Sequence, residues 1–221
     1  MIVATLPPLR VVAHAFTPAD LRAGHLALDF INTAAGLNRD ARDWLDSYAR
    51  LVEWAELAGV CGDGAGAALL AAEAADKAGG RAALERVRRL RAALYSLVLA
   101  NRDGLETPSP ALDELQQWCR RAGGATTLSS DKAGVLRRSL GGCGLDVVGA
   151  TVALAAVALL EEPLAERVGV CGGRNCGWLF VDATKSRRRR WCDMKTCGNA
   201  AKASRHYQRK LAHGGASLRS T

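Results

Sequence analysis

The sequence is poor in aromatic residues and in long hydrophobic segments. Only 5% of its 221 residues are Phe, Trp or Tyr, although 49% are hydrophobic. A folded core must therefore consist mainly of Ala, Leu and Val, which favours packed helices with small side-chain contacts. The longest apolar run, residues 147–160, is shorter than the roughly 20 residues that a helix needs to cross a bilayer. We therefore expect a buried helix there and no membrane association.

The chain also lacks the pattern of a secretory signal. Its first residues, MIVATLPPLRVV, have no basic start before an uninterrupted apolar stretch, and Pro7 and Pro8 interrupt them. This predicts a cytoplasmic protein, in which cysteines indicate metal binding or catalysis rather than disulfides. Three of the seven cysteines, Cys61, Cys119 and Cys143, are scattered, and we expect them to be small, buried or half-buried side chains.

Acidic residues are scarce in the last quarter of the chain. Residues 166–221 contain 13 Lys and Arg but only 3 Asp and Glu, whereas residues 1–165 contain 17 and 19. The net charge of +8 therefore combines a nearly neutral first region with a last region of +10. This division is typical of a nucleic-acid-binding module that follows another domain.

The first region has the hydrophobic spacing of a mainly helical domain with one small β-hairpin. Apolar residues recur at intervals of three to four and predict helices over 43–57, 67–77, 82–101 and from Ser109 or Pro110 onward. We expect Asp43 to be the N-cap of the first helix and Gly59 its end. Two short runs, 126–128 and 135–140, predict the hairpin, and Asp146 is expected to cap the buried helix.

Two polar groups in the first region could carry chemistry, but we favour structural roles for both. Four arginines on the helix over 82–101 predict a solvated face rather than a second nucleic-acid surface; they are Arg86, Arg88, Arg89 and Arg91. In GHLALDFINT, His25, Asp29 and Asn32 could form a catalytic or ligand-binding trio, but we favour polar side chains that cap a helix or a loop. Since no nucleophile motif or phosphate loop occurs in this region, we expect no catalytic residues and no enzyme.

The four remaining cysteines have the spacing of a zinc site. The segments CGGRNC and CDMKTC each place four residues between two cysteines, and fifteen residues separate the pairs. Tetrahedral Zn²⁺ needs four ligands about 2.3 Å from the ion, and two close pairs that a hairpin brings together meet this need. We therefore predict one zinc ion bound by Cys171, Cys176, Cys192 and Cys197.

A small hairpin is expected between the cysteine pairs. Residues 178–181 predict a strand, and residues 187–191 predict a return strand that places Trp191 over Trp178 and Phe180. Since a core this small cannot fold alone, zinc should supply much of the folding free energy of the module.

After Cys197 the sequence predicts an amphipathic helix that runs to Ala212. Its apolar side, which includes Ala200, Tyr207 and Leu211, is expected to cover the hairpin and the zinc site. The opposite side and the run of four arginines are basic, and binding of a polyanion would relieve their mutual repulsion. We predict nucleic-acid contacts from Arg187, Arg188, Arg189, Arg190, Lys202, Arg205, His206 and Arg209.

These motifs resemble a known family. The segment CGWLFVDATKSRRRRWCDMKTCGNAAKASRHYQRK resembles the CGNR zinc finger of bacterial proteins with an N-terminal ABATE domain, which are described as stress-induced transcription regulators. GHLALDFINT and DWLDSYARLVEWAELAGV resemble the start of that domain. The resemblance implies that the four cysteines bind zinc and that the finger contacts DNA.

The chain departs from the family pattern at two places. Ala200 stands where Arg is usual, and this change could weaken a hydrogen bond within the finger or a contact at the helix start. Thr184, Lys185 and Ser186 stand where Ser-Arg-Asn is usual, which keeps one cation and the polarity of the turn. Neither departure affects the four cysteines.

The sequence thus predicts a mainly α fold of the α+β class in three parts. These are a helical ABATE-like domain over 1–163, a treble-clef- or ribbon-like zinc finger over 168–211 that ends in the basic helix, and a flexible tail over 212–221. The predicted function is a zinc-dependent, DNA-binding transcription regulator. The helical domain is the expected place for a homodimer contact or a small-molecule effector.

Three other functions remain open. The same cations could bind RNA or a ribosome, since both DNA and RNA present a phosphate backbone. An enzyme could have its site around Asp29. Oxidation of the cysteines could also eject the zinc, although nothing in the sequence marks one thiol as unusually reactive.

Overall fold

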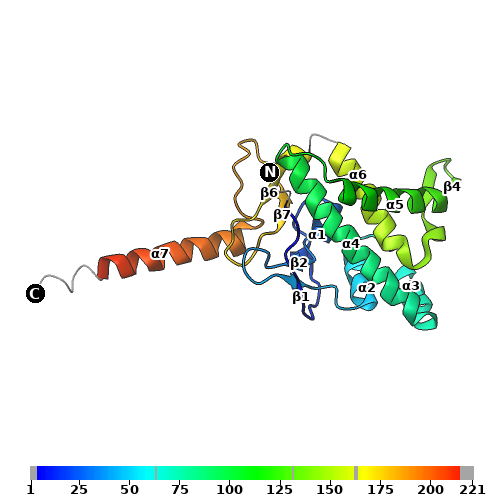
Figure 1. Ribbon diagram of the computed structural model, residues 1–221, viewed down its shortest axis with the longest axis horizontal. Coiled ribbons are helices and arrows are strands. Elements are labelled where there is room, and N and C mark those ends of the chain that lie inside the picture. The colour runs from blue at the N-terminus through cyan, green and yellow to red at the C-terminus, as the bar shows by residue number, and fades with distance from the viewer. Residues whose placement is uncertain (1–3, 63, 131, 162–163, 215–221) are drawn as a thin grey trace, which may run out of the picture.

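The computed structural model describes residues 4–62, 64–130, 132–161 and 164–214, and shows a helical body from which one long helix projects (Figure 1). Its helices are α1 (Leu26–Ile31), α2 (Tyr48–Leu57), α3 (Ala65–Ala75), α4 (Lys77–Arg102), α5 (Ser109–Ala125), α6 (Val147–Glu161) and α7 (Asn199–Gly214). Its strands are β1 (Arg10–Val11), β2 (Ala34–Ala35), β3 (Arg42–Asp43), β4 (Thr127–Ser130), β5 (Leu136–Ser139), β6 (Val168–Val170) and β7 (Leu179–Val181). The predicted fold class, mainly helical with small sheets and a four-cysteine module that ends in a helix, is confirmed.

Each helix predicted in the first region is present, but α3 lies two residues earlier than predicted and α4 begins at Lys77 rather than at Ala82. The start of α2 also differs. This helix begins at Tyr48 rather than after Asp43, and the hydroxyl of Ser47 caps it by accepting a hydrogen bond from the backbone N–H of Arg50 at 3.2 Å. Asp43 cannot serve as the cap because it belongs to β3, where Arg91 binds its carboxylate. The helix ends as predicted, since Gly59 follows it with a positive φ of 69°.

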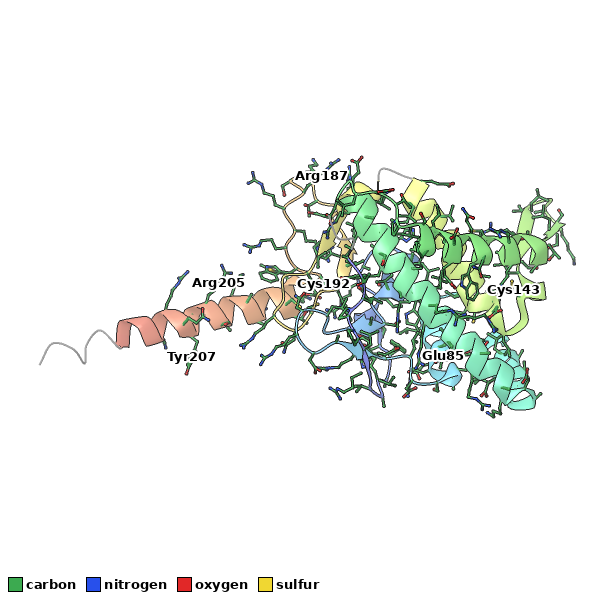
Figure 2. The ribbon with its side chains drawn as sticks, viewed as in Figure 1. Glu85, Cys143, Arg187, Cys192, Arg205 and Tyr207 are labelled. Atoms are coloured by element: carbon green, nitrogen blue, oxygen red, sulfur yellow. The ribbon has the colours of Figure 1, made fainter. Side chains whose placement is uncertain are left out.

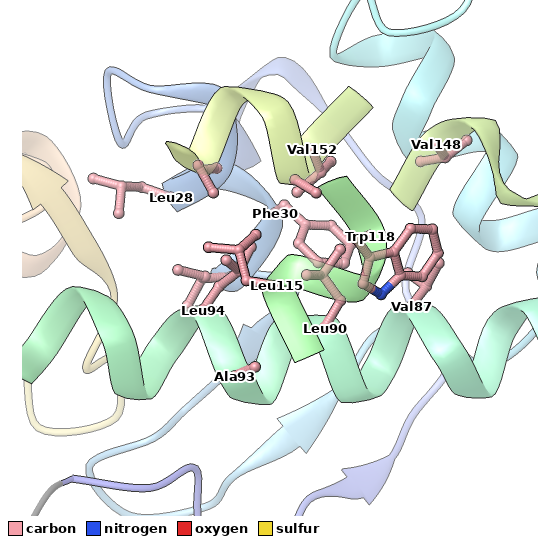
Figure 3. Close-up of a cluster of buried hydrophobic side chains, with 14 of the residues drawn as sticks. Leu28, Phe30, Val87, Leu90, Ala93, Leu94, Leu115, Trp118, Val148 and Val152 are labelled. Carbon is pink, nitrogen blue, oxygen red and sulfur yellow. The ribbon is translucent and has the colours of Figure 1, made fainter. Parts of the chain in front are cut away.

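The core of the body is formed around α6 (Figure 3), and α1, α4 and α5 pack against that helix. Trp118 on α5 is fully buried and lies directly against Gly149 on α6, where an added Cβ would be 2.3 Å from the indole ring. The close approach of these two helices therefore requires glycine at this position. Leu90, Leu94 and Leu115 extend the same layer, as the low aromatic content predicts.

One apolar helix has the length and composition to cross a membrane. It is Gly141–Glu161, which combines a short 3₁₀ turn with α6 and has a mean hydropathy of 2.1 over its most apolar window. The buried residues of α6 include Val148, Val152 and Leu159, all at 0% exposure. The structure thus places this segment as a core helix, in agreement with the prediction from its length.

The arginines of α4 are largely neutralised within the body, which corrects the expectation of a solvated face. Arg91 is 1% exposed and donates to both carboxylate oxygens of Asp43, at 2.8 and 2.6 Å, and to the hydroxyl of Thr33 at 2.8 Å. Arg88 also contacts Asp43, with Nε 3.2 Å from Oδ2. These contacts fasten α4 to the small sheet, because β3 carries Asp43.

The other two arginines of α4 are less enclosed. Arg86 donates to Asp146 at 2.9 and 3.0 Å, and so holds the residue that was expected to cap α6. Arg89 is more exposed and lies 3.9 Å from Glu114. All four arginines therefore have an acidic neighbour within 4 Å.

The small sheets were predicted only in part. The β4–β5 hairpin is confirmed, with Leu128 opposite Arg138 and Ser130 opposite Leu136. The three-stranded sheet β1-β3-β2 was not predicted, because each strand has only two residues and no alternating pattern to mark it. It positions the loop between β2 and β3, which contacts the cysteine cluster.

Candidate metal centre and nucleic-acid interface

The cysteine cluster is supported by an antiparallel hairpin that differs from the predicted one. β7 pairs with β6, which precedes the first cysteine, and Gly169 lies opposite Phe180. The expected return strand over 187–191 is absent from the described residues, and that segment runs as irregular chain. Gly169 explains the choice of partner, because an added Cβ would be 2.6 Å from the Phe180 ring. Only glycine lets the ring lie across β6 so closely.

The four predicted ligands meet at one point. The Sγ atoms of Cys171, Cys176, Cys192 and Cys197 all lie within 4.8 Å of one another, and all four cysteines are free of disulfides. The Sγ of Cys192 is 3.6 Å from that of Cys176 and 3.7 Å from that of Cys197. Four sulfurs about 2.3 Å from a tetrahedral zinc would be about 3.8 Å apart. The cluster therefore has the geometry of a structural Zn²⁺ site, and the predicted cofactor is confirmed.

The chemistry of the thiols also fits a divalent cation. Hydrogen bonds from Cys176 and Cys192 lower the pKa of Cys171, whereas the hydrogen bond to Cys171 raises the pKa of each of those two neighbours. Without a metal ion, thiolates this close repel one another, so ionisation of one opposes ionisation of the next. A bound Zn²⁺ removes this conflict because its charge stabilises all four thiolates at once.

Each cysteine pair is held by a compact turn. In the first turn the backbone N–H of Cys176 donates to Gly173 at 3.0 Å, and a Cβ on Gly173 would be 3.0 Å from the Sγ of Cys197. In the second, Asp193 caps a π-helical turn over Met194–Gly198 and accepts hydrogen bonds from two backbone N–H groups. These turns point both members of each pair at the same place.

The predicted miniature core is present around the cluster. Phe180 is fully buried with Cys171 and Cys192, and Trp178 and Trp191 pack against them as half-buried side chains. The aromatic residues thus cover one side of the cluster, where Cys171 and Cys192 are buried, although Trp191 lies on irregular chain rather than on a strand.

Arg189 is held inside the finger, which changes its expected role. Its guanidinium lies 4.5 Å from the centre of the Phe180 ring and donates to the backbone oxygens of Trp191, at 2.9 Å, and of Cys192. Its backbone N–H donates to Asp182 at 2.8 Å. We therefore assign Arg189 to folding, because these bonds replace the missing return strand. Its neighbours Arg187, Arg188 and Arg190 are exposed.

Helix α7 does not cover the zinc site, so this prediction was wrong. The helix leaves the body beside Cys192 and extends outward (Figures 1 and 2), and every side chain from Lys202 to Lys210 is exposed. Tyr207, expected on the buried side, is 64% exposed, and Ala200 is exposed as well. The side chain of Leu211 lies outside the described residues. Four residues expected to bind nucleic acid lie on this exposed helix: Lys202, Arg205, His206 and Arg209.

The first region covers the finger instead, through contacts that the sequence did not predict. The side-chain amide of Asn32 donates to the backbone oxygen of Leu179 at 2.9 Å and accepts from its N–H at 2.9 Å. Asn38 donates to the backbone oxygens of Cys171, at 3.1 Å, and of Gly173, at 2.6 Å.

Further contacts extend this interface. The backbone N–H of Leu37 donates to the oxygen of Cys176 at 2.8 Å, and Arg22 pairs with Asp193. Val168, Leu179 and Val181 belong to the main hydrophobic core of the body. The first region therefore packs against the finger, and the loop between β2 and β3, rather than α7, contacts the backbone of the first cysteine turn.

The motif GHLALDFINT is structural, as the analysis of the sequence favoured. Nδ1 of His25 accepts a hydrogen bond from the N–H of Ala27 at 3.2 Å and caps α1. Asp29 accepts from the N–H of Ala23 at 2.9 Å, and burial raises its pKa to about 6. Asn32, at the C-terminal end of α1, binds β7. These three polar side chains thus orient α1 against the finger.

The three scattered cysteines are also as expected. Cys61, Cys119 and Cys143 are half-buried, and burial raises the pKa of each thiol. A raised pKa leaves little thiolate at neutral pH, so these cysteines are poor nucleophiles and poor metal ligands.

Two family models match the chain, one over each of its two regions. Residues 24–163 match the ABATE family model, described as "Putative stress-induced transcription regulator", and residues 167–210 match the CGNR zinc finger. No individually curated protein matches the chain. The ABATE match covers more than half of the sequence, and the four clustered cysteines lie within the second match. The chain therefore belongs to the ABATE family and ends in a CGNR zinc finger.

Proposed function

We propose that this protein is a cytoplasmic, zinc-dependent transcription regulator that binds DNA through α7 and the arginine run, and that it is not an enzyme. The observation that carries this proposal is the charge of the finger. Arg187, Arg188, Arg190 and the cations of α7 are exposed. The two carboxylates of the finger already have partners within the protein. Asp182 binds Thr184 and Arg189, and Asp193 pairs with Arg22 of the first region. Binding to phosphates would neutralise the exposed cations.

The dimensions of α7 suit the major groove of DNA. Its 16 residues extend about 24 Å at 1.5 Å per residue. A helix with its side chains is about 10–12 Å wide, and the major groove of B-DNA is about 12 Å wide. α7 projects from the body (Figure 1), which would leave the helix accessible to the groove. Lys202, Arg205 and Arg209 share one side of it and would contact the backbone or base edges.

The arginine run would act as a second point of attachment. Arg187, Arg188 and Arg190 lie on the irregular chain next to the cluster, and Figure 2 shows the Arg187 region and α7 on the same end of the molecule. Phosphate contacts of this kind fix the position and orientation of a protein on the duplex. The rigid attachment of the finger to the first region would then orient the whole body on DNA.

We assign assembly or sensing to the ABATE domain. A single module buries only about 600–1,000 Å² on DNA, and regulators commonly add a second half-site by forming a dimer. Light scattering of the full-length protein on duplex DNA should give two chains per duplex. One chain per duplex, with undiminished affinity, would refute the assembly role and leave sensing.

Fluorescence anisotropy with the full-length, zinc-loaded protein tests the proposal. The probes are a DNA duplex recovered with the protein from cells and a structured RNA, compared at the same series of salt concentrations. Arg188→Ala and Arg205→Ala should each weaken duplex binding and reduce the slope of log K against log salt by about 1. Arg89→Ala is the matched control, since Arg89 is an exposed arginine of the first region, and it should leave both values unchanged.

Two results would count against the proposal. Tighter binding of RNA than of DNA at every salt concentration would favour the RNA-binding alternative. An equal loss from Arg89→Ala and Arg188→Ala would mean that the first region is part of the binding surface.

A further inference from the structure

A groove lies beside the zinc site, between the first cysteine turn, the arginine run and the start of α7. We call it the finger groove. It has a volume of about 700 Å³, within the range of roughly 300–1,000 Å³ that is common for small-ligand sites. Arg174, Arg190, Trp191, Ala200, Ala201 and Arg205 are among the residues that line it. This volume is much larger than a phosphate group requires.

The charge of the finger groove is of one sign. Arg174, Arg190 and Arg205 come from three different segments, and all three are exposed. No Asp or Glu lines the groove among the described residues. The contacts of Arg190 and Arg205 leave their charges unneutralised, since Arg190 lies over the Trp191 ring at 5.6 Å and Arg205 donates to a backbone oxygen of its own helix. The groove therefore attracts an anion.

The remaining lining of the finger groove is mostly apolar, and Asn175, Thr196 and Ser204 are its uncharged polar members. Trp191 is half-buried in its wall, and Gly172, Gly173, Ala200 and Ala201 contribute little or no side chain. A purely ionic ligand such as phosphate would leave these surfaces in contact with water. A ligand that joins an aromatic ring to a phosphate satisfies both parts, because a base packs on apolar and aromatic surfaces while guanidinium groups bind its phosphate.

Ala200 keeps this groove open. The four letters of the CGNR finger correspond here to Cys197, Gly198, Asn199 and Ala200, so alanine stands at the position of the arginine. An arginine side chain from this place in the lining would extend into the groove and add a fourth guanidinium to it. The small residue instead leaves space for a ligand.

We propose that the finger groove binds a nucleotide, with the base against Trp191 and the alanines of α7 and the phosphate between Arg174 and Arg205. The proposal rests on the nucleic-acid function proposed above for its ligand class. The groove shares Arg190 and Arg205 with the proposed duplex-binding surface, whereas Arg174 and Ala200 belong to the groove alone. The nucleotide can be a free effector or one unpaired residue of a strand, since both present the same base and phosphate.

Isothermal titration calorimetry of the full-length, zinc-loaded protein tests this site. The ligands are thymidine monophosphate, adenosine monophosphate, inorganic phosphate and a single-stranded oligonucleotide of eight thymidines. At least one nucleotide should bind ten times or more tighter than inorganic phosphate, because the base contributes contacts. Equal binding of phosphate and nucleotides would overturn the proposal. An oligonucleotide that binds ten times or more tighter than the monophosphates identifies a strand as the source, and equal affinities identify a free effector.

Matched variants locate the binding. Ala200→Arg fills the groove and should weaken nucleotide binding at least tenfold, even though it adds a positive charge. Ala203→Arg adds the same charge to α7 outside the groove and should not weaken it. Arg174→Ala, which changes an exposed side chain, should weaken binding about five- to tenfold while zinc content stays at one per chain. Equal behaviour of Ala200→Arg and Ala203→Arg overturns the groove as the site.

Duplex binding separates this proposal from the previous one. If nucleotides fail to bind while Arg188→Ala still weakens duplex binding, the groove proposal fails and the DNA-binding function stands. If nucleotides bind with the expected variant pattern and no duplex binds, the groove stands and the protein is a nucleotide-responsive regulator of another kind.

Discussion

The two regions of this molecule use arginine in opposite ways. In the ABATE domain, Arg91 is buried against Asp43 and Arg86 is bound by Asp146, so the charges hold helices and strands together. In the finger, Arg187, Arg188 and Arg190 are exposed. Of these four consecutive arginines, only Arg189 donates hydrogen bonds that hold the finger together. The comparison shows that an arginine count alone does not locate a binding surface. The two regions differ in whether a carboxylate lies close to each guanidinium group.

The largest effect should follow from loss of the metal site. Cys192→Ser removes one of four ligands, and structural zinc contributes roughly 10–16 kcal/mol to the folding of zinc-finger peptides. We expect less than one tenth of the normal zinc content and a loss of duplex binding of at least 100-fold. Elemental analysis and anisotropy measure these two quantities. Cys119→Ser is the control and should retain one zinc per chain, since Cys119 is a half-buried cysteine outside the cluster.

A large effect on stability alone should follow from Arg91→Met in the first region. This change leaves the buried carboxylate of Asp43 without its main partner, which typically costs about 3–5 kcal/mol. Urea denaturation should show the loss, and Arg89→Met, at an exposed position on the same helix, should cost much less. The folded fraction should still bind duplex DNA with normal affinity. A change in the salt dependence of binding would contradict the division between structural and binding arginines.

The boundary between the regions can be tested with Asn32→Ala. The variant loses both hydrogen bonds to Leu179 and leaves a buried N–H and a buried oxygen without partners, each of which costs about 1–3 kcal/mol. We expect a lower free energy of unfolding by about 2–5 kcal/mol together with faster zinc release to a chelator. Asn101→Ala, at an exposed position near the end of α4, should change neither. Normal zinc release from Asn32→Ala would show that the finger is energetically independent of the ABATE domain.

The smallest effect concerns Asp29, whose pKa burial raises to about 6 from 3.8. The folded state therefore binds the proton more tightly than the unfolded state, so this group lowers stability as pH rises from about 4 to 6. Asp29→Asn should remove that pH dependence and leave the variant more stable relative to the parent at pH 7 than at pH 4, by at most about 3 kcal/mol. Because both proteins contain zinc, the difference between their unfolding curves isolates Asp29. Parallel curves across this pH range would rule out a raised pKa.

The sequence was sufficient where the relevant residues are close together along the chain. The zinc ligands were found because two short pairs of cysteines carry their own signature. The α6 helix was found from its continuous apolar run, and α5 from the spacing of its apolar residues. The fully buried Trp118 was placed on its helix in the same way. Local patterns of this kind determine elements and metal sites directly.

The predictions that failed at the zinc finger mainly concern which surfaces meet. Asn32 and Leu179 are separated by 147 positions, and no local pattern links an amide on α1 to the backbone of β7. The amphipathic pattern of α7 shows which side of the helix could pack. It does not show that Leu37 and Asn38 already contact the backbone beside the cysteine cluster. Likewise, the run of four arginines gives no sign that Arg189 alone turns inward, because its partners are backbone oxygens and the ring of Phe180.

The exposure of α7 has a thermodynamic consequence for recognition. From Lys202 to Lys210 its side chains are exposed, so its helicity depends mainly on local propensity rather than on tertiary packing. Isolated helices of about this length are marginal in water. If α7 binds DNA as proposed, part of the binding free energy is used to complete the helix, and the affinity depends on the helix–coil equilibrium as well as on contacts. Under that proposal, exchanging alanine and glycine on α7 would change the affinity for DNA through helix stability alone, without altering a cationic side chain.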